Sequence, residues 1–404
     1  MNELVKQMPA FLSKEDFIKA SLTTTATENV SYMSETERLL LLDKVFDTYI
    51  PSFMSLEIYQ KVYLSIYRSL SQKQTFASVQ QRNINYRRML GTVCKGVIGG
   101  GNVILISGVA GIGKTAAIYN AVALATNQTI IETNQPLQRV IPCLIIQTPF
   151  DCSTKALLLE ILRKVDDILE TNYYPRTIPT VDTLIGSVCN ICINHIGLLI
   201  IDEIQNVVNH RAGISLVHCL TELINNSGIS MVFVGTPECE VFFSSTDYLA
   251  RRAIGLHYGP LDFNNDFHGL CSILWHQQPL LNYTRITTVE YEWLYEHTGG
   301  ITANIVSLLH DAMELAILSG TEILNLQILN EVYLYRMSPL HQYIAPTIQV
   351  KNNKSTKKKN NIPKPYKIAN KQNIISSTIA TARAENMNVI DALATVINVT
   401  EVSI

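Results

Sequence analysis

Residues 108–115 read GVAGIGKT, and this octapeptide constrains the fold more than any other part of the chain. It matches the pattern G-x-x-x-x-G-K-[S/T] in full. The apolar segment NVILIS precedes it and the helical pattern TAAIYNAVALAT follows it, which is the strand–loop–helix context that the pattern needs. Backbone amides in such a loop point inward at phosphate oxygens, and the following helix adds the positive end of its dipole. The segment therefore predicts a phosphate-binding loop.

The residues of this loop are expected to have separate roles. Gly108, Gly111 and Gly113 permit the tight backbone path. Lys114 is expected to reach the β- and γ-phosphates of ATP, and the Thr115 hydroxyl to bind Mg²⁺. The alternative is a glycine turn that binds nothing, which the flanking strand and helix argue against.

Between about residue 100 and residue 260, short apolar runs alternate with helical patterns such as LLLEILRKVDDIL and SLVHCLTELINN. The runs are apolar at successive positions, as in parallel strands that are buried on both faces. This alternation predicts a doubly wound α/β sheet. The expected strands are Val103–Ser107, Ile141–Gln147, Leu198–Ile201, Met231–Val234 and Ala253–His257.

A second motif, GLLIIDEIQNV, spans residues 197–207. Its apolar run places Asp202 and Glu203 at the carboxyl edge of a strand, where open α/β sheets bind ligands. Asp202 is expected to help bind Mg²⁺, and Glu203 to polarise a water molecule that attacks the nucleotide. An ordinary strand-end turn is the alternative, but the position after the glycine-rich loop favours an ATPase.

Two further segments predict catalytic side chains. In SMVFVGTPE, Thr236 follows a buried strand and is expected to sense the γ-phosphate, although a helix that begins near Pro237 explains the same residues. In YLARRAIG, Arg251 or Arg252 is a candidate arginine finger, supplied to a neighbouring subunit. A solvated helix end or an ion pair is the alternative for these arginines.

Helical patterns flank the alternating region on both sides. Ser34 and Glu37 predict a capping box, and a second helix is expected over Ser55–Leu70. Residues 262–336 read as helices only, and in ITANIVSLLHDAMELAILSG an apolar stripe ends at Gly320. This arrangement predicts a helical N-terminal region and a small helical lid.

Charge is unevenly distributed. The segment Lys351–Lys371 holds eight lysines and no acid, and subtracting them from the net charge of -2 leaves -10 for the rest. The segment is expected to be a flexible linker, or an electrostatic contact for DNA or a partner. Any nucleic-acid contact in the acidic remainder must be local.

Neither a metal framework nor a membrane segment is expected. Cys189 and Cys192 have metal-like spacing without a second pair, so they are expected to be core residues of a buried helix. No apolar run is long enough to span a membrane, and the N-terminus lacks the apolar stretch of a secretory signal. A cytoplasmic location without membrane contact is therefore expected.

Together these phrases resemble TnsC, the AAA+ regulator family of Tn7-like transposons, and the related TniB proteins. The similarity covers roughly residues 35–335 and includes GVAGIGKT, LLIIDEIQNV, FVGTPE, DCSTKALLLEILRKVDDILETNYY and the lid phrase TGGITANIVSLLHDAMELAILSG. It implies an ATP-dependent homo-oligomer, a ring or helical filament on double-stranded DNA, that links a target-selecting protein to the transposase. One departure is Asn304, which stands where many AAA+ lids carry an arginine.

The resemblance places Thr154 and Lys155 near the central channel of such an oligomer, as candidates for DNA-phosphate contacts. An N-cap and a surface lysine are the alternative. The expected division is a helical N-terminal region (1–95), an AAA+ core (96–260), a lid (261–338), a lysine-rich linker (339–373) and a tail (374–404). A helicase-loader-type ATPase, or a signalling module that binds nucleotide without hydrolysing it, would also fit the motifs.

Overall fold

The structure is a computed structural model of the 404-residue chain. The described residues all lie in the first of two units, Met1–Thr347. The lysine-rich segment Lys351–Lys371 and the tail 374–404 lie outside the described residues. The structure describes residues 3–24, 30–73, 75–89, 101–134, 137–151, 153–177, 179–207, 213–244 and 251–339.

A six-stranded sheet in the order β2-β3-β4-β5-β1-β6 forms the centre of the first unit. β2 is antiparallel to β3, and the other neighbouring strands are parallel. The strands are β1 (Val103–Gly108), β2 (Ile131–Asn134), β3 (Leu137–Gln147), β4 (Ile196–Asp202), β5 (Ser230–Gly235) and β6 (Ala253–Tyr258). This confirms the predicted α/β fold and its five strands, whereas β2 is too short to stand out in the sequence.

The prediction of burial on both faces is wrong for β6. Only Leu256 is buried in this strand, and Ile254 is 46% exposed. β6 pairs with β1 and forms an edge of the sheet, so it lacks a second neighbouring strand. The central strands β1, β4 and β5 are buried at every position, as predicted.

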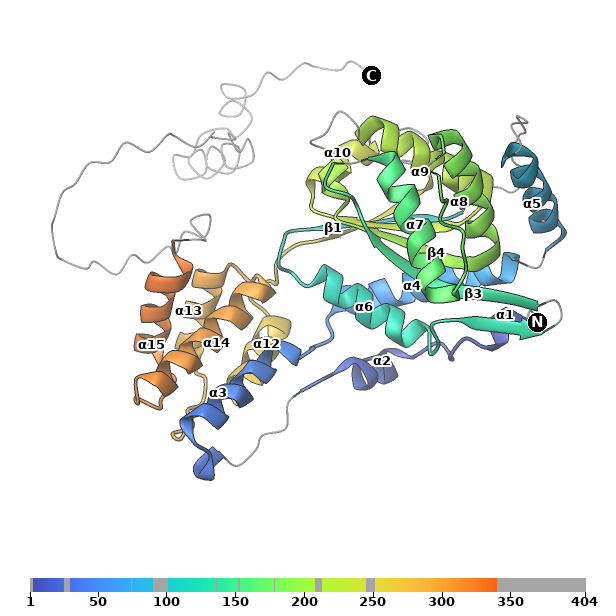
Figure 1. The fold of residues 1–404 in the computed structure, drawn as a ribbon. Helices are drawn as coiled ribbons and strands as arrows, with labels where there is room; N and C mark the ends of the chain where they lie inside the picture. Colours follow the sequence, from blue (N-terminus) through green and yellow to red (C-terminus); the bar gives the residue numbers. More distant parts are fainter. Residues whose placement is uncertain are drawn as a thin grey trace, which may run out of the picture. The chain divides into compact units, whose positions relative to one another are not determined.

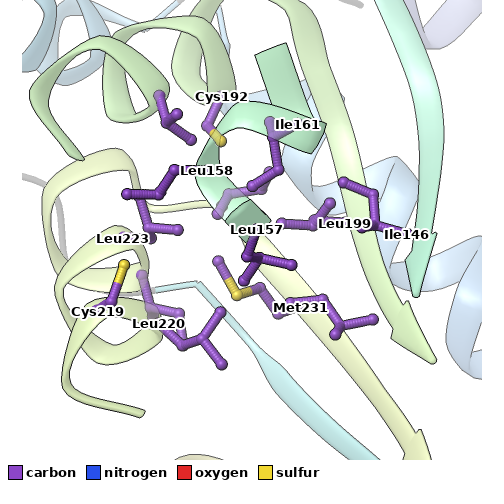
Figure 2. Packing of buried hydrophobic residues seen from close by; sticks show 14 of the residues in the cluster. Ile146, Leu157, Leu158, Ile161, Cys192, Leu199, Cys219, Leu220, Leu223 and Met231 are labelled. Atoms are coloured by element: carbon purple, nitrogen blue, oxygen red, sulfur yellow. The ribbon is translucent and has the colours of Figure 1, made fainter. Parts of the chain in front are cut away.

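Helices cover both faces of the sheet (Figure 1). Alternate side chains of a strand point to opposite faces, so Leu105, Leu199 and Phe233 join one core cluster while Ile106, Ile200 and Val234 join another. Figure 2 shows the first cluster, where Cys192 packs among aliphatic side chains, as expected for a core cysteine. The helices of this face are α7 (Thr154–Leu169), α8 (Val181–His195) and α9 (Gly213–Ser227), with α5 (Phe76–Met89) against α8.

The opposite face is covered by α6 (Lys114–Ala125) and α4 (Phe53–Gln72), which pack against each other. Ser52 caps α4 through its hydroxyl, and Tyr59 and Ile66 of this helix are fully buried. The short helices α1 (Glu3–Lys6) and α2 (Lys14–Ser21) join the same cluster through Leu4 and Phe17. Part of the N-terminal region is therefore built into the core of the sheet domain.

The lid has an apolar core of its own, into which Leu42 and Val45 of the N-terminal region also pack. Its long helix ends before Gly320, which has φ +70°, and this confirms the predicted stop. The lid helices are α12 (Asn265–His276), α13 (Thr288–Thr298), α14 (Thr302–Leu318) and α15 (Leu326–Val332), followed by the π-helical turn η4 (Tyr333–Met337).

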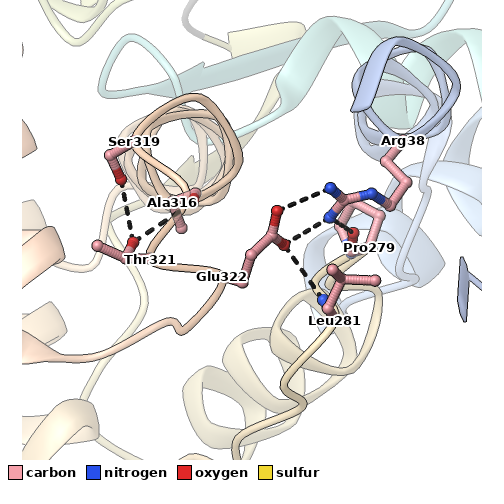
Figure 3. Close-up of polar contacts among 7 residues, drawn as sticks. All are labelled: Arg38, Pro279, Leu281, Ala316, Ser319, Thr321 and Glu322. Carbon is pink, nitrogen blue, oxygen red and sulfur yellow. Dashed lines mark hydrogen bonds and ion pairs between the residues drawn. The ribbon is translucent and has the colours of Figure 1, made fainter. Parts of the chain in front are cut away.

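The N-terminal region reaches both the sheet domain and the lid. Between α2 and α4, helix α3 (Glu35–Asp43) begins at the predicted capping box and packs against α14. The 3₁₀ turn η2 (Lys44–Asp47) follows α3. After it, Tyr49 forms an isolated antiparallel bridge with Thr23, which follows α2. Figure 3 shows Arg38 of α3 paired with Glu322 after α14. The same stretch of chain therefore contacts both the sheet domain and the lid.

In the part of the chain that the structure describes, no single helix is both long enough and apolar enough to cross a membrane. The bent pair α13 and α14 passes that test by length and composition alone.

Candidate functional site

The loop between β1 and α6 follows a path that depends on glycine. Gly111 and Gly113 have φ of +84° and +93°, a left-handed conformation that side chains disfavour. A Cβ on Gly108 would lie 2.6 Å from the Tyr258 carbonyl oxygen, so β6 approaches the loop too closely for a larger residue. The predicted loop thus lies at the carboxyl end of β1, with α6 directly behind it.

Lys114 folds back over the loop. Its Nζ donates to the carbonyl oxygens of Gly108 and Val109, at 2.7 and 3.0 Å. Burial lowers the pKa of Lys114, while the nearby Asp202 and Glu203 oppose that shift. The Lys114 ammonium therefore lies at the glycine-rich loop, where the sequence predicts the phosphates.

Thr115 and Asp202 meet across the cleft, although 87 positions separate them. The Thr115 hydroxyl donates to Asp202 Oδ2 at 3.1 Å. Thr148 fixes the end of β4, because its backbone amide and its hydroxyl both donate to the Asp202 carbonyl at 2.9 Å. A hydroxyl beside a carboxylate is a donor set that suits Mg²⁺, which prefers oxygen ligands and keeps several waters. The two predicted metal residues are thus adjacent, as that role requires.

Glu203 turns away from the strand in a left-handed conformation, with φ +58°. Its backbone amide donates to Asp202 Oδ1 at 2.8 Å, which fixes the turn. Its exposed side chain accepts a hydrogen bond from Gln205 Nε2. Glu203 and Asp202 both line the cleft, as the sequence predicts.

Thr236 also lines the cleft, at the end of β5 beside β1. Its backbone amide donates to Gln205 Oε1 at 3.3 Å. Hydrogen bonding by its side chain holds the pKa of Glu238 below the ordinary value. Glu238 begins α10 (Glu238–Ser244), so the Pro-initiated helix and the cleft position of Thr236 are both present.

The lid closes one side of the cleft. The Ala303 amide donates to the Gly111 carbonyl at 2.9 Å, which joins the first turn of α14 to the loop. Asn304 is buried and donates to the Thr298 carbonyl at 3.3 Å, so it lies inside the lid rather than in the cleft. The cleft has a volume of about 320 Å³, and its lining includes Lys114, Thr115, Asp202, Glu203, Gln205, Thr236 and Ala303.

Arg251 and Arg252 lie away from this cleft. They directly precede β6, which runs parallel to β1, so they are at the amino edge of the sheet while the loop is at the carboxyl edge. Arg251 is exposed, and Arg252 Nη1 lies 3.5 Å from Asn225 Oδ1 of α9. Neither can serve the cleft of its own subunit, so a catalytic role requires a neighbouring one.

Thr154 and Lys155 form the first turn of α7 and are half-buried. The N-cap of this helix is Ser153, whose hydroxyl accepts from the Ala156 amide at 3.2 Å. The alternative reading of Thr154 as the N-cap is therefore wrong. Both side chains remain candidates for a phosphate contact at a helix N-terminus.

Two residues of the cleft, Gln205 and Ala303, match no functional motif in the sequence. The signal for Gln205 is its place in the phrase IDEIQ, two residues after Glu203. The signal for Ala303 is the segment after Gly299-Gly300, where only the neighbouring Asn304 is noted. Gln205 reaches Thr236 and Ala303 reaches Gly111, and both partners are distant in sequence, so no local pattern reveals these contacts.

Residues 98–243 match the sequence family described as an AAA domain. This match and the parallel sheet with its glycine-rich loop identify the fold as that of an AAA+ P-loop NTPase. No curated protein matches the chain.

Solved structures with similar folds include two proteins of Aeropyrum pernix. The ORC1 protein in complex with DNA has 14% identity and a TM-score of 0.42, over 64% of each chain. The ORC2 protein in its ADP form has 17% identity and a TM-score of 0.41, over 65% of this chain and 68% of the other. The chain thus spans less than two thirds of the ORC1 protein.

Proposed function

We propose that the chain hydrolyses ATP, and that the Thr115–Asp202 contact with Glu203 beside it is the centre of that activity. The observation that carries the proposal is the 3.1 Å approach of Thr115 Oγ1 to Asp202 Oδ2 at the mouth of the glycine-rich loop. Phosphate binding alone would need the loop and Lys114. A carboxylate on the hydroxyl of Thr115 and a second carboxylate in the same cleft add what hydrolysis requires.

In this proposal, the loop amides and Lys114 bind the phosphates of ATP. Thr115 and Asp202 would hold Mg²⁺, which supplies neutralisation of charge on the phosphate oxygens. Glu203 orients a water molecule and accepts its proton as the water oxygen bonds to the γ-phosphorus. The bond from that phosphorus to the β,γ-bridging oxygen breaks, ADP and phosphate leave, and Glu203 returns the proton to solvent.

The finer assignment is an ATP-dependent regulator of DNA transposition. It rests on the resemblance of GVAGIGKT, LLIIDEIQNV, FVGTPE and the lid phrase to TnsC. The edge position of Arg251 supports the oligomeric part of this assignment, because an exposed arginine far from its own cleft suits a ring or filament of identical subunits. Such an oligomer on double-stranded DNA would link a target-selecting protein to the transposase.

The ATPase proposal is tested by phosphate release from the purified full chain, with Mg²⁺ and with or without double-stranded DNA. Wild type should release phosphate, and Lys114→Ala should lose both nucleotide binding and release. Normal ATP affinity in Lys114→Ala would contradict the site. Nucleotide binding by wild type without release would instead favour the signalling module.

The partner is tested separately, because a helicase loader would share every ATPase residue. The purified chain with ATP is offered the transposase from its own genetic locus and the replicative helicase of its host. Retention of the transposase alone supports the transposition role. Retention of the helicase alone contradicts it and favours the helicase-loader alternative.

A further inference from the structure

Gln205 lies between the two strand ends that border the cleft. It belongs to the 3₁₀ turn η3 (Ile204–Val207), which is separated from β4 by Glu203 alone. Its Nε2 donates to Glu203 Oε2, and its Oε1 accepts from the Thr236 backbone amide at 3.3 Å. One carboxamide therefore joins the carboxylate beside β4 to the backbone at the end of β5.

The end of β5 has room for this carboxamide only because residue 235 is glycine. A Cβ at Gly235 would lie 2.8 Å from Gln205 Oε1 and 2.9 Å from Ile204 Cγ2. Gly235 has no φ that requires glycine, so its conformation alone does not explain the residue. A close approach by η3 does explain it.

The bridge acts on a side chain that is exposed to solvent. The turn fixes the backbone of Glu203 through Asp202 Oδ1, but its exposed carboxylate has several rotamers available. A hydrogen bond from Gln205 selects one of these rotamers. The other end of Gln205 binds the Thr236 amide. The Glu203 carboxylate is therefore held at a set position relative to the end of β5, where the γ-phosphate is expected.

We propose that Gln205 is a positioning residue, which holds the Glu203 carboxylate in register with the end of β5 for attack on the γ-phosphate. The proposal rests on the proposed ATPase function and deepens it. Gln205 does not itself exchange a proton, since a carboxamide does not titrate. Its effect on the reaction is through Glu203, and the orientation of a reacting group contributes strongly to rate.

The test compares four variants of the full chain with wild type, by single-turnover hydrolysis at saturating ATP. Gln205→Ala removes both hydrogen bonds, and Gly235→Ala displaces the carboxamide while leaving it present. Gln205→Glu keeps an acceptor for Thr236 but sets a second carboxylate against Glu203. Gln327→Ala is the matched control, because Gln327 is an exposed glutamine of the lid. Affinity for a fluorescent ATP analogue and the melting temperature are measured for each variant.

For Gln205→Ala and Gly235→Ala we expect turnover to fall about ten- to a hundredfold, with nucleotide affinity kept. Gln205→Glu should show a different signature. Two carboxylates in hydrogen-bond contact retain a shared proton to higher pH, so the acid limb of its pH–rate profile should move upward by about one unit or more. A role in packing alone would lower the melting temperature without moving the pH profile.

Turnover in Gln205→Ala equal to that of Gln327→Ala would overturn the proposal. So would an unchanged pH profile in Gln205→Glu. Wild type that binds ATP without hydrolysing it would instead refute the ATPase function, and the positioning role would fall with it. If Gln205→Ala hydrolyses ATP as fast as wild type does, only the positioning role is refuted. The two failures are therefore distinguishable.

Discussion

Arg38 and Glu322 form a two-pronged ion pair, with Nη1–Oε2 at 2.5 Å and Nη2–Oε1 at 2.7 Å, across 284 positions of the chain. Their side chains are only 5% and 12% exposed. Glu322 also accepts from the Leu281 amide at 3.2 Å, and Arg38 donates to the Pro279 carbonyl at 3.3 Å (Figure 3). This pair fixes α3 to the lid, because planar guanidinium and carboxylate groups match in two places at once.

Arg38→Met should destabilise the lid, because it leaves the Glu322 carboxylate buried without its cation. The loss of one partner from a buried pair costs about 3–5 kcal/mol. The measurement is urea unfolding followed by tryptophan fluorescence, which reports on the lid because Trp275 and Trp293 are the two tryptophans of the chain.

Arg163→Met is the control for that variant. Arg163 pairs with Glu160 one turn away, and its side chain is 62% exposed. An exposed pair contributes about 0–1 kcal/mol, so this variant should unfold almost as wild type does. An equal decrease in the free energy of unfolding in the two variants would show that the buried pair stabilises the protein no more than the exposed one.

The same pair predicts a pH dependence. Arg38 holds the pKa of Glu322 below its ordinary value. A folded-state pKa below the unfolded one gives stability that is present above about pH 4.3, the unfolded value for glutamate, and lost as pH falls through the folded pKa. The free energy of unfolding of wild type should therefore drop below about pH 4. Glu322→Gln should show a smaller drop in that window, and an identical pH dependence would contradict the prediction.

Glu203→Gln should separate binding from hydrolysis. The amide preserves size but cannot accept the proton of the attacking water, while Lys114 and the Thr115–Asp202 pair are untouched. Turnover should fall by about a hundredfold or more, with ATP affinity kept. ATP-bound oligomers on DNA should persist longer, as measured by light scattering after excess nucleotide is removed. Wild-type turnover in this variant would show that another residue orients the water.

The sequence was sufficient for the parts of the fold that depend on local pattern. Apolar runs mark β1, β4 and β5 because these strands are buried on both faces. The glycine-rich loop and the Asp202–Glu203 step are contiguous motifs, so each could be assigned to the carboxyl edge of a strand. The parallel order of the sheet places both motifs at one edge, and the structure adds the 3.1 Å contact between Thr115 and Asp202.

Contacts between distant segments could not be predicted in this way. The capping box of α3 was readable, but nothing local shows that Arg38 would pair with Glu322 rather than face solvent. Gln205 likewise binds Thr236 across 31 positions. The sequence shows only that Asn304 stands where many AAA+ lids carry an arginine. The structure places it inside the lid, where it donates to the Thr298 carbonyl.

Arg251 should act on a neighbouring subunit. We expect Arg251 rather than Arg252 to be the finger, because Arg251 is exposed while Arg252 lies beside Asn225 of α9. Arg251→Ala should bind ATP normally and hydrolyse it slowly. Mixed with Glu203→Gln, which binds ATP but hydrolyses it slowly, it should regain part of the turnover, because the Glu203→Gln subunit supplies an intact Arg251. An arginine that acts within its own subunit would give no recovery on mixing.

The final prediction concerns DNA. The chain without Lys351–Lys371 carries a formal charge of -10, so binding should depend on a few local contacts that oligomerisation repeats. Thr154 and Lys155, in the first turn of α7, are the candidates. Replacing both with alanine should weaken binding to all DNA sequences alike and flatten its salt dependence, since phosphate contacts carry no sequence information. ATP binding should be unaffected.

The rival idea is that the lysine-rich segment binds the DNA. Deleting every residue after Ser338 removes its eight lysines and leaves α7 in place. DNA binding with ATP is then measured across a salt series for the double variant, the truncated chain and Lys19→Ala, an exposed lysine of α2 that serves as the matched control. If the α7 residues bind the DNA, the double variant should lose DNA affinity while the truncated chain and the control retain most of it. If the truncated chain loses DNA and the double variant keeps it, the lysine-rich segment is the DNA-binding element, because its charges then supply the phosphate contacts.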